Sequence, residues 1–177
     1  MTFPGEERGD PSDEGLLAAN AASRWRDADV TERVEVERAA TPWSELLAGS
    51  LGHEVALIVA DATRLQGVVI EAGADWCLLE AGGRALLIPL RQVVTVSGLG
   101  RAAPQVGTRA GMGWVLRRWR QMRSQLTVHL VDRSVLHGQV ADVLADAFTL
   151  GVDSERESLI TIPFTAVCRV AGDQLSE

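Results

Sequence analysis

The chain has few or none of several residue types, and each shortage narrows what the protein can be. Its 177 residues include two cysteines, too few for a disulfide-stapled secreted domain. The longest apolar run, Val55 to Ala60, is far shorter than the roughly 20 residues that a membrane-spanning helix needs. The first ten residues, MTFPGEERGD, lack a basic segment followed by an apolar one, so we expect no signal peptide. These shortages predict a cytoplasmic protein without a membrane partner.

Lysine and tyrosine are absent and Asn20 is the single asparagine, so all 17 basic residues are arginines. The codons of these scarce residues are AT-rich. We therefore infer a GC-rich genome rather than selection of arginine for bidentate phosphate binding. Apolar residues make up 46% of the chain and charged residues 23%, which excludes wholesale disorder and indicates a globular protein.

Charge is unevenly distributed along the chain, whose formal net charge is −7. Residues 1–52 hold five arginines against eleven acidic residues, whereas residues 101–123 hold six arginines and no acidic residue. Such a basic segment inside an acidic protein either attracts a polyanion or docks onto the protein's own acidic surface.

Two stretches of the chain match each other. Residues 53–80 align with residues 124–151 at an offset of 71, and a three-residue insertion then moves the offset to 74. So many matches with one small gap indicate a tandem duplication. The matched pairs are Trp43/Trp114, Asp61/Asp132, Leu65/Leu136, Gly67/Gly138, Val69/Val140, Ala74/Ala145, Asp75/Asp146 and Leu79/Leu150, followed by Ile88/Ile162, Pro89/Pro163, Val93/Val167, Val96/Val170 and Gly98/Gly172.

Each repeat predicts short strands in which polar and apolar residues alternate. Turns are expected at Asp61-Ala62 and Asp132-Arg133, because aspartate bonds to its own backbone in turns. Gly67 and Gly138 lie inside the strands that follow. A glycine there indicates a bend or a close backbone approach, as a small closed barrel needs.

A short helix is expected before each set of strands. In the first, Thr41 is the predicted N-cap, Pro42 takes the first helical position and the helix runs to Gly49. The second helix, within residues 113–123, is predicted to be amphipathic. Its apolar stripe consists of Val115, Trp119 and Met122, with Arg117 and Arg120 on the opposite face.

These patterns predict a mostly β fold with short helices, built from two tandem small β-barrels that are each preceded by a helix. The predicted parts are a disordered acidic tail (1–22), a charged N-terminal helix (23–41), a first barrel with its leading helix (42–98), a linker (99–112), a second barrel with a basic leading helix (113–172) and a tail (173–177).

In the first repeat, a short helix is followed by VALIVADATRLQGVVIEAGADWCLLE and then by LLIPLRQVVTV. This order resembles the Sm/Hfq-like small barrel of five bent strands, and it occurs twice between residues 43 and 172. The ending IPL…V is also similar to the SH3-like C-terminal domain of ribosome maturation factor P. The whole chain resembles an actinobacterial family that is loosely labelled Fis-family transcriptional regulator. The resemblance implies small barrels that bind other molecules rather than catalyse reactions.

The positions at which Sm proteins contact RNA hold other residues here. The family has an Asn in the turn before its third strand, whereas the two repeats have Asp75-Trp76-Cys77 and Asp146-Ala147-Phe148 in that stretch. The family also has Arg-Gly after its fourth strand, and here Pro89-Leu90 and Pro163-Phe164 take that place. A base-binding pocket needs an amide to read a base edge and a platform for stacking. We therefore do not expect an Sm-type RNA pore, and exposed strand edges remain available for self-association.

No pattern in the sequence predicts an enzyme, a cofactor or a metal. Gly82-Gly83 lacks the lysine and the Ser/Thr of a phosphate-binding loop. Cys77 and Cys168 share no CxxC spacing, so we expect buried thiols. The repeated carboxylates are explained as turn formers, because no nucleophile or base accompanies them. They are Asp61, Asp132, Asp75 and Asp146.

Two histidines form a candidate pair. His129 and His137 lie directly across from each other if the hairpin turn centres on Arg133. Two imidazoles so placed would bind a divalent ion, but no third ligand is evident. We therefore expect a surface pair without metal, and His53 has no visible partner.

The basic segment holds the candidate nucleic-acid contacts, in which arginines bind phosphates and indoles stack on bases. They are Arg109, Trp114, Arg117, Arg118, Trp119, Arg120 and Arg123. The alternative is a helix that buries both tryptophans while its arginines pair with the acidic first helix or tail. Trp43 occupies the matching position in a non-basic helix, which favours packing for Trp114.

The sequence thus predicts a non-enzymatic cytoplasmic binding or assembly module that acts through strand edges and the charged N-terminal region. We expect a protein partner or self-association. The alternative is a nucleic-acid-associated regulator that binds RNA or DNA through residues 113–123.

Overall fold

The structure, a computed structural model, describes residues 41–99, 105–152 and 158–173. The described residues from Pro42 onward belong to one compact unit. The predicted acidic tail (1–22), the charged helix (23–41) up to residue 40, and the final tail beyond Asp173 lie outside the described residues.

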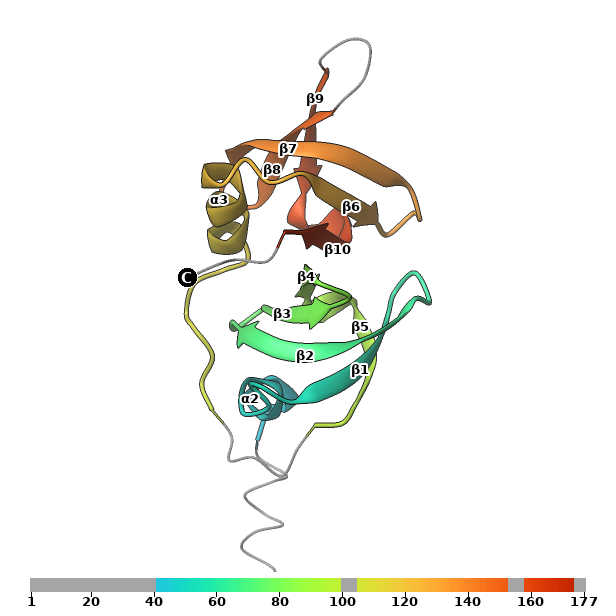
Figure 1. Cartoon of the computed structure of the whole chain (residues 1–177), viewed down its shortest axis with the longest axis vertical. Helices are drawn as coiled ribbons and strands as arrows, with labels where there is room; N and C mark the ends of the chain where they lie inside the picture. The colour runs from blue at the N-terminus through green and yellow to red at the C-terminus, as the bar shows by residue number, and fades with distance from the viewer. Residues whose placement is uncertain (1–40, 100–104, 153–157, 174–177) are drawn as a thin grey trace, which may run out of the picture. The chain divides into compact units, whose positions relative to one another are not determined.

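In the described part of the chain, ten antiparallel strands form a single sheet, so the prediction of a mostly β fold with short helices is confirmed. The first five are β1 (Glu54–Val59), β2 (Arg64–Ala72), β3 (Trp76–Ala81), β4 (Arg84–Pro89) and β5 (Val93–Ser97). The second five are β6 (Leu126–Leu130), β7 (Val135–Val143), β8 (Ala147–Val152), β9 (Ser158–Pro163) and β10 (Val167–Gly172). Their order in the sheet is β5-β1-β2-β3-β4-β10-β6-β7-β8-β9, and β4 and β10 lie side by side where the two sets meet (Figure 1).

Within the described ranges, each set of strands follows a short helix and contains one 3-10 turn. The helices are α2 (Trp43–Ala48) and α3 (Gly113–Gln121), and the 3-10 turns are η1 (Leu90–Gln92) and η2 (Phe164–Ala166). Among the described residues, no helix is long and apolar enough to cross a membrane.

Both helix predictions need correction at their ends. Pro42 has an extended ψ of 138°, so it precedes α2 at the N-cap position instead of opening the helix, and Thr41 is not the N-cap. The helix ends at Ala48, one residue before the predicted end, and Gly49 is its C-cap. Helix α3 ends at Gln121, so Met122 falls beyond it and is exposed rather than part of the buried stripe. Leu116 is buried on α3 instead.

Residues at the predicted offset of 71 adopt the same local conformation. Ala62 and Arg133 both have a positive φ, of 67° and 71°. In both turns the aspartate accepts a 2.9 Å hydrogen bond from the backbone two residues on, which confirms Asp61 and Asp132 as turn formers. The irregularities of β2 and β7 correspond as well, since each falls one residue after a matched valine, Val69 or Val140.

The glycines in β2 and β7 allow a close approach of the neighbouring strand, as the sequence indicated. A Cβ atom on Gly67 would lie 2.4 Å from the carbonyl oxygen of Glu80. On Gly138 it would lie 2.0 Å from that of Gly151. Both distances are far below van der Waals contact with backbone that cannot rotate away, so only glycine fits.

Buried side chains form two hydrophobic clusters, and each draws residues from both sets of strands. The cluster beside α2 and β1 includes Cys168 from β10. The cluster beside α3 includes Trp76, Leu78 and Leu87 from β3 and β4. The two sets therefore stabilise each other through shared apolar burial as well as through the continuous sheet.

Candidate functional site

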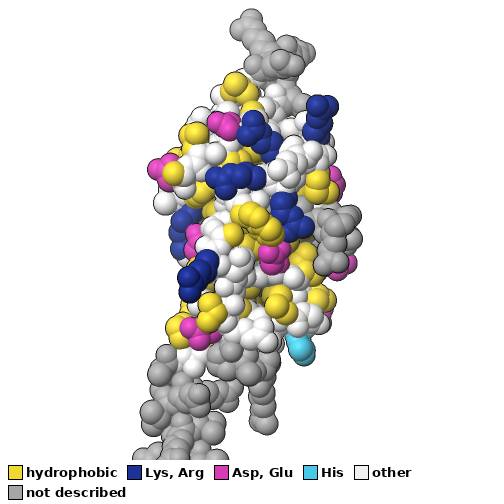
Figure 2. Space-filling model, turned by 90° about the vertical axis from the view of Figure 1, so that its left-hand side faces the viewer, with side chains coloured by type: hydrophobic (Ala, Val, Ile, Leu, Met, Phe, Trp, Pro, Cys, Tyr) yellow, Lys and Arg dark blue, Asp and Glu magenta, His cyan; other side chains and the backbone are white. Residues whose placement is uncertain are grey.

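Helix α3 and the residues beside it carry every candidate nucleic-acid contact. Arg109 precedes the helix and Arg123 follows it, while Trp114, Arg117, Arg118, Trp119 and Arg120 lie within it. Figure 2 shows the face of the molecule on which α3 lies. In that view the arginine side chains are interspersed with acidic and hydrophobic side chains.

The two tryptophans of α3 serve packing. Trp119 is fully buried, and its Nε1 donates a 3.0 Å hydrogen bond to the carbonyl oxygen of Asp173. Trp114 is 37% exposed, and its ring stacks on Trp76 of β3 with centroids 6.3 Å apart. The guanidinium carbon of Arg118 lies 4.7 Å from the centre of the Trp114 ring. Trp119 is therefore inaccessible to a base, and Trp114 already has two partners.

Two arginines of α3 pair with acidic side chains of the sheet. Arg118 lies 3.3 Å from Glu71 of β2, and Arg120 lies 3.1 Å from Asp142 of β7. Burial raises the pKa of Glu71, although Arg118 opposes the shift. Both acidic partners belong to strands, whereas the predicted acidic helix and tail, up to residue 40, lie outside the described residues. Three of the candidate arginines make no ion pair with other described residues, namely Arg109, Arg117 and Arg123.

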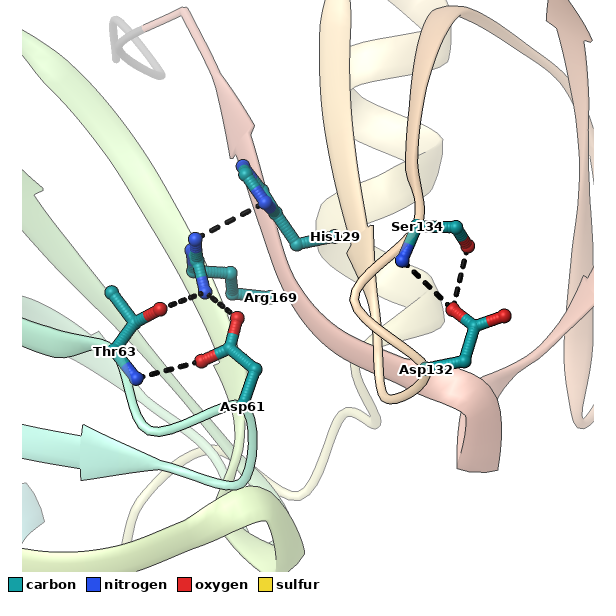
Figure 3. A network of polar contacts seen from close by, with 6 residues as sticks. All are labelled: Asp61, Thr63, His129, Asp132, Ser134 and Arg169. Carbon is teal, nitrogen blue, oxygen red and sulfur yellow. Dashed lines mark hydrogen bonds and ion pairs between the residues drawn. The ribbon is translucent and has the colours of Figure 1, made fainter.

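A polar network links the first turn of one set of strands to the last strand of the other (Figure 3). The guanidinium of Arg169 on β10 donates to the carboxylate of Asp61, and it also donates to the Thr63 hydroxyl at 3.1 Å. Its other nitrogen donates to Nδ1 of His129 at 3.1 Å. The Asp61 and Arg169 side chains are only 8% and 12% exposed. The sequence analysis missed Arg169, which the offset of 74 aligns with Thr95.

The network shifts the pKa values of its members. Burial alone would raise the pKa of Asp61, but the hydrogen bonds from Thr63 and Arg169 outweigh it and hold that pKa below its ordinary value. Burial and the neighbouring Arg169 charge lower the pKa of His129. Both shifts favour a neutral imidazole beside an ionised carboxylate.

The predicted pairing of His129 with His137 is wrong. The register of β6 and β7 places His137 opposite Thr127 and His129 opposite Val135. The reason is that the hairpin turn centres on Asp132, one residue before the predicted Arg133, which moves each facing pair by two positions. Within the described ranges, no group of three His, Cys, Asp or Glu side chains could hold a metal ion.

The two cysteines are free and buried, as predicted. Burial raises the pKa of Cys77 to about 12 and also raises that of Cys168. Since the thiolate is the reactive form, neither side chain is poised as a nucleophile.

Strands β5 and β9 are the two ends of the sheet. Large apolar side chains on both strands face solvent, with Val94 65% and Leu159 71% exposed. A groove of about 360 Å³ follows β5 from Val93 to Val96 and reaches Trp43. A second groove, of about 350 Å³, lies between β7, β8 and β9 and includes Leu159.

Inside the sheet, β4 of the first set of strands pairs with β10 of the second set. At the β4–β10 junction, Leu87 lies opposite Val170, Leu86 opposite Ala171 and Ala85 opposite Gly172. The Gln92 side chain reinforces it with a 3.1 Å hydrogen bond to the carbonyl oxygen of Thr165.

The polar network therefore lies beside the β4–β10 junction. Of the candidate arginines, Arg109 borders a small pocket together with Thr108. Comparisons of the chain with protein-family models and with curated proteins give no match.

Proposed function

We propose that this chain is a non-enzymatic binding and assembly protein, which joins other polypeptides by accepting a strand at the ends of its sheet. A strand at the edge of a sheet presents backbone N–H and C=O groups that another strand can bond. Here both ends combine such an edge with an exposed apolar side chain and a groove. Proteins usually protect such edges with charge or proline, and Val94 and Leu159 do the opposite.

The β4–β10 junction is the observation that carries the proposal. There, a strand from one half of the chain completes the sheet edge of the other half. We propose that each half is a small, strongly bent barrel of the Sm/SH3-like kind, and that the chain arose by tandem duplication. The matching turns, bulges and close-approach glycines of the two halves support this interpretation.

The charged N-terminal region remains a predicted second element of the function. It lies outside the described residues, so its part in binding rests on its charge alone.

Binding of an added strand can be tested with peptides copied from the internal junction. A fluorescent peptide of residues 84–90 carries the sequence of β4 and should bind the β5 edge. A peptide of residues 167–172 carries the sequence of β10 and should bind the β9 edge. Fluorescence anisotropy measures both affinities, and scrambled peptides serve as controls.

Two variants should separate the edges. Val94→Lys should weaken binding of the β4 peptide at least tenfold and leave the β10 peptide unaffected, while Leu159→Lys should do the reverse. Each variant is the control for the other, because both residues are exposed and neither substitution disturbs the core. Failure of both peptides to bind would refute the proposed function.

Nucleic-acid binding through α3 remains the alternative proposal, with less support. Arg117 and Arg123 offer exposed charge for phosphates. However, Trp119 is buried and Arg118 and Arg120 already have acidic partners, so only part of the predicted contact surface is available.

A further inference from the structure

We propose that a small pocket beside α2 binds a small zwitterion, an α-amino acid of about the size of alanine, between the guanidinium of Arg109 and the carboxylate of Glu45. The pocket includes no residue of β5 or β9, so this site is separate from the sheet ends of the proposed function.

Three segments of the chain line this pocket, which has a volume of about 170 Å³. They are the first turn of α2 with Ser44 and Glu45, the turn between β2 and β3 with Gly73 and Ala74, and residues 106–109. In Figure 1 the third segment belongs to the stretch that runs from beside α2 to the start of α3. Because the walls come from distant parts of the chain, no local sequence pattern indicates the pocket.

Backbone contacts hold the walls of the pocket in place. The N–H of Gln105 donates a 3.1 Å hydrogen bond to the carbonyl oxygen of Glu45. The N–H of Thr108 donates a 3.0 Å hydrogen bond to that of Ala72. Between them, a Cβ atom on Gly107 would lie 2.5 Å from the Ala72 oxygen, so only glycine allows this approach. The pocket therefore exists before a ligand arrives, and binding need not order a loop.

Two side chains of opposite charge line the pocket without bonding to each other. Glu45 is half-buried and Arg109 is exposed. Neither makes an ion pair with any side chain in the described part of the chain, so a gap separates their charged groups. A ligand that carries both a carboxylate and an ammonium group would bridge this gap and satisfy both charges.

The chemistry of each wall sets the orientation of the ligand. The planar guanidinium of Arg109 can donate two parallel hydrogen bonds to a carboxylate. The ligand's carboxylate therefore faces Arg109, and its ammonium group donates to the Glu45 carboxylate. Val106 also lines the pocket and is 82% exposed, so an aliphatic group on the ligand would remove apolar surface from water there.

The volume of the pocket limits the size of the ligand. A water molecule occupies about 30 Å³ in the liquid, so the pocket accommodates about six non-hydrogen atoms, the size of alanine. Such a small ligand, held partly by an exposed arginine, binds weakly. We expect a Kd of about 1 mM.

A titration of the full chain with L-alanine tests the site, with the backbone amide shifts followed by NMR spectroscopy. We expect saturable shifts at residues 44–45, 73–74 and 106–109. Acetate and ethylammonium each carry one of the two charges of the ligand. At equal ionic strength each should bind roughly tenfold more weakly than alanine, because it satisfies one wall of the pocket and leaves the other unpaired.

Two variants test the charged walls separately. Glu45→Gln and Arg109→Gln should each weaken alanine binding roughly tenfold, since each removes one charged partner. Arg117→Gln is the matched control. Arg117 is also exposed and also lacks an ion pair with the described residues, but it does not line the pocket. This control should bind alanine as the unmodified chain does, and the spectrum of each variant reports whether the fold is intact.

Shifts that fail to saturate, or an unchanged affinity in either Glu45→Gln or Arg109→Gln, would overturn the assignment. Equal affinities for alanine and acetate would overturn it as well, because Arg109 would then bind any carboxylate without help from Glu45. These outcomes leave strand addition at β5 and β9 untouched, since the peptides test it independently.

Discussion

The guanidinium of Arg169 bonds to the carboxylate of Asp61, although the two residues lie 108 positions apart in the chain. One belongs to the last strand and the other to the first turn between strands, so their ion pair ties the two halves together beside the β4–β10 junction. The same turn in the second half, at Asp132, has no such partner among the described residues.

Replacing Asp61 by Asn should lower the free energy of unfolding by about 2 kcal/mol at pH 7, because it leaves the largely buried Arg169 without its counter-ion. Chemical denaturation measures the change. Asp132→Asn is the matched control, since it alters the same turn position without removing an ion pair, and it should cost clearly less. Equal losses in the two variants would mean that the ion pair adds nothing beyond the turn.

Stability should fall when the pH drops below the ordinary pKa of His129, 6.5. The pKa of His129 is lowered in the folded chain, so the unfolded state takes up the proton first and gains stability relative to the folded one as the pH falls. Arg169 and His137 oppose the imidazolium, whereas Asp61 favours it. Denaturation at a series of pH values should show this loss between pH 7 and 5. His129→Gln should lack that part of the pH dependence, and an identical profile would contradict the assignment.

Gly138→Ala should destabilise the fold by about 1–3 kcal/mol, because its Cβ would lie 2.0 Å from the backbone oxygen of Gly151. Thermal unfolding measures the effect. Gly111→Ala is the control: a Cβ there meets nothing within 4 Å, and its midpoint should hardly change. A tolerated Gly138→Ala would show that the strands can separate at little cost.

Arg118→Ala should destabilise the protein by about 1 kcal/mol, since it removes the contacts with both Glu71 and Trp114. Arg117→Ala, on the exposed side of the same helix, should have little effect in denaturation.

If α3 serves packing, labelled single-stranded RNA and duplex DNA should not bind at physiological salt. Binding with a salt slope of several units, reduced in Arg117→Gln/Arg123→Gln, would favour the alternative function.

Much of the local structure could be predicted from the sequence because it depends on residues close together in the chain. The turns at Asp61 and Asp132 follow from aspartate bonding its own backbone, and the glycines at 67 and 138 follow from strand geometry. A small local error in the prediction had a large consequence. The hairpin turn was predicted one residue too late in the chain, and the predicted facing pair of His129 and His137 is therefore wrong.

The candidate site could not be predicted in the same way, because it depends on contacts between distant segments. No local pattern indicates that β4 pairs with β10 or that Arg169 reaches Asp61. The repeat did contain one signal, in retrospect. Where two aligned positions differ in kind, as Thr95 and Arg169 do, or Leu78 and Thr149, one copy faces the junction and the other faces solvent.

The most direct test of the account is fluorescence anisotropy of the β4 and β10 peptides with the full chain, beside the variant Val94→Lys/Leu159→Lys. The account predicts that both peptides bind the unmodified chain while the variant, folded by circular dichroism, binds neither. Equal binding of the peptides to the two proteins, or no binding to either, would contradict strand addition at β5 and β9.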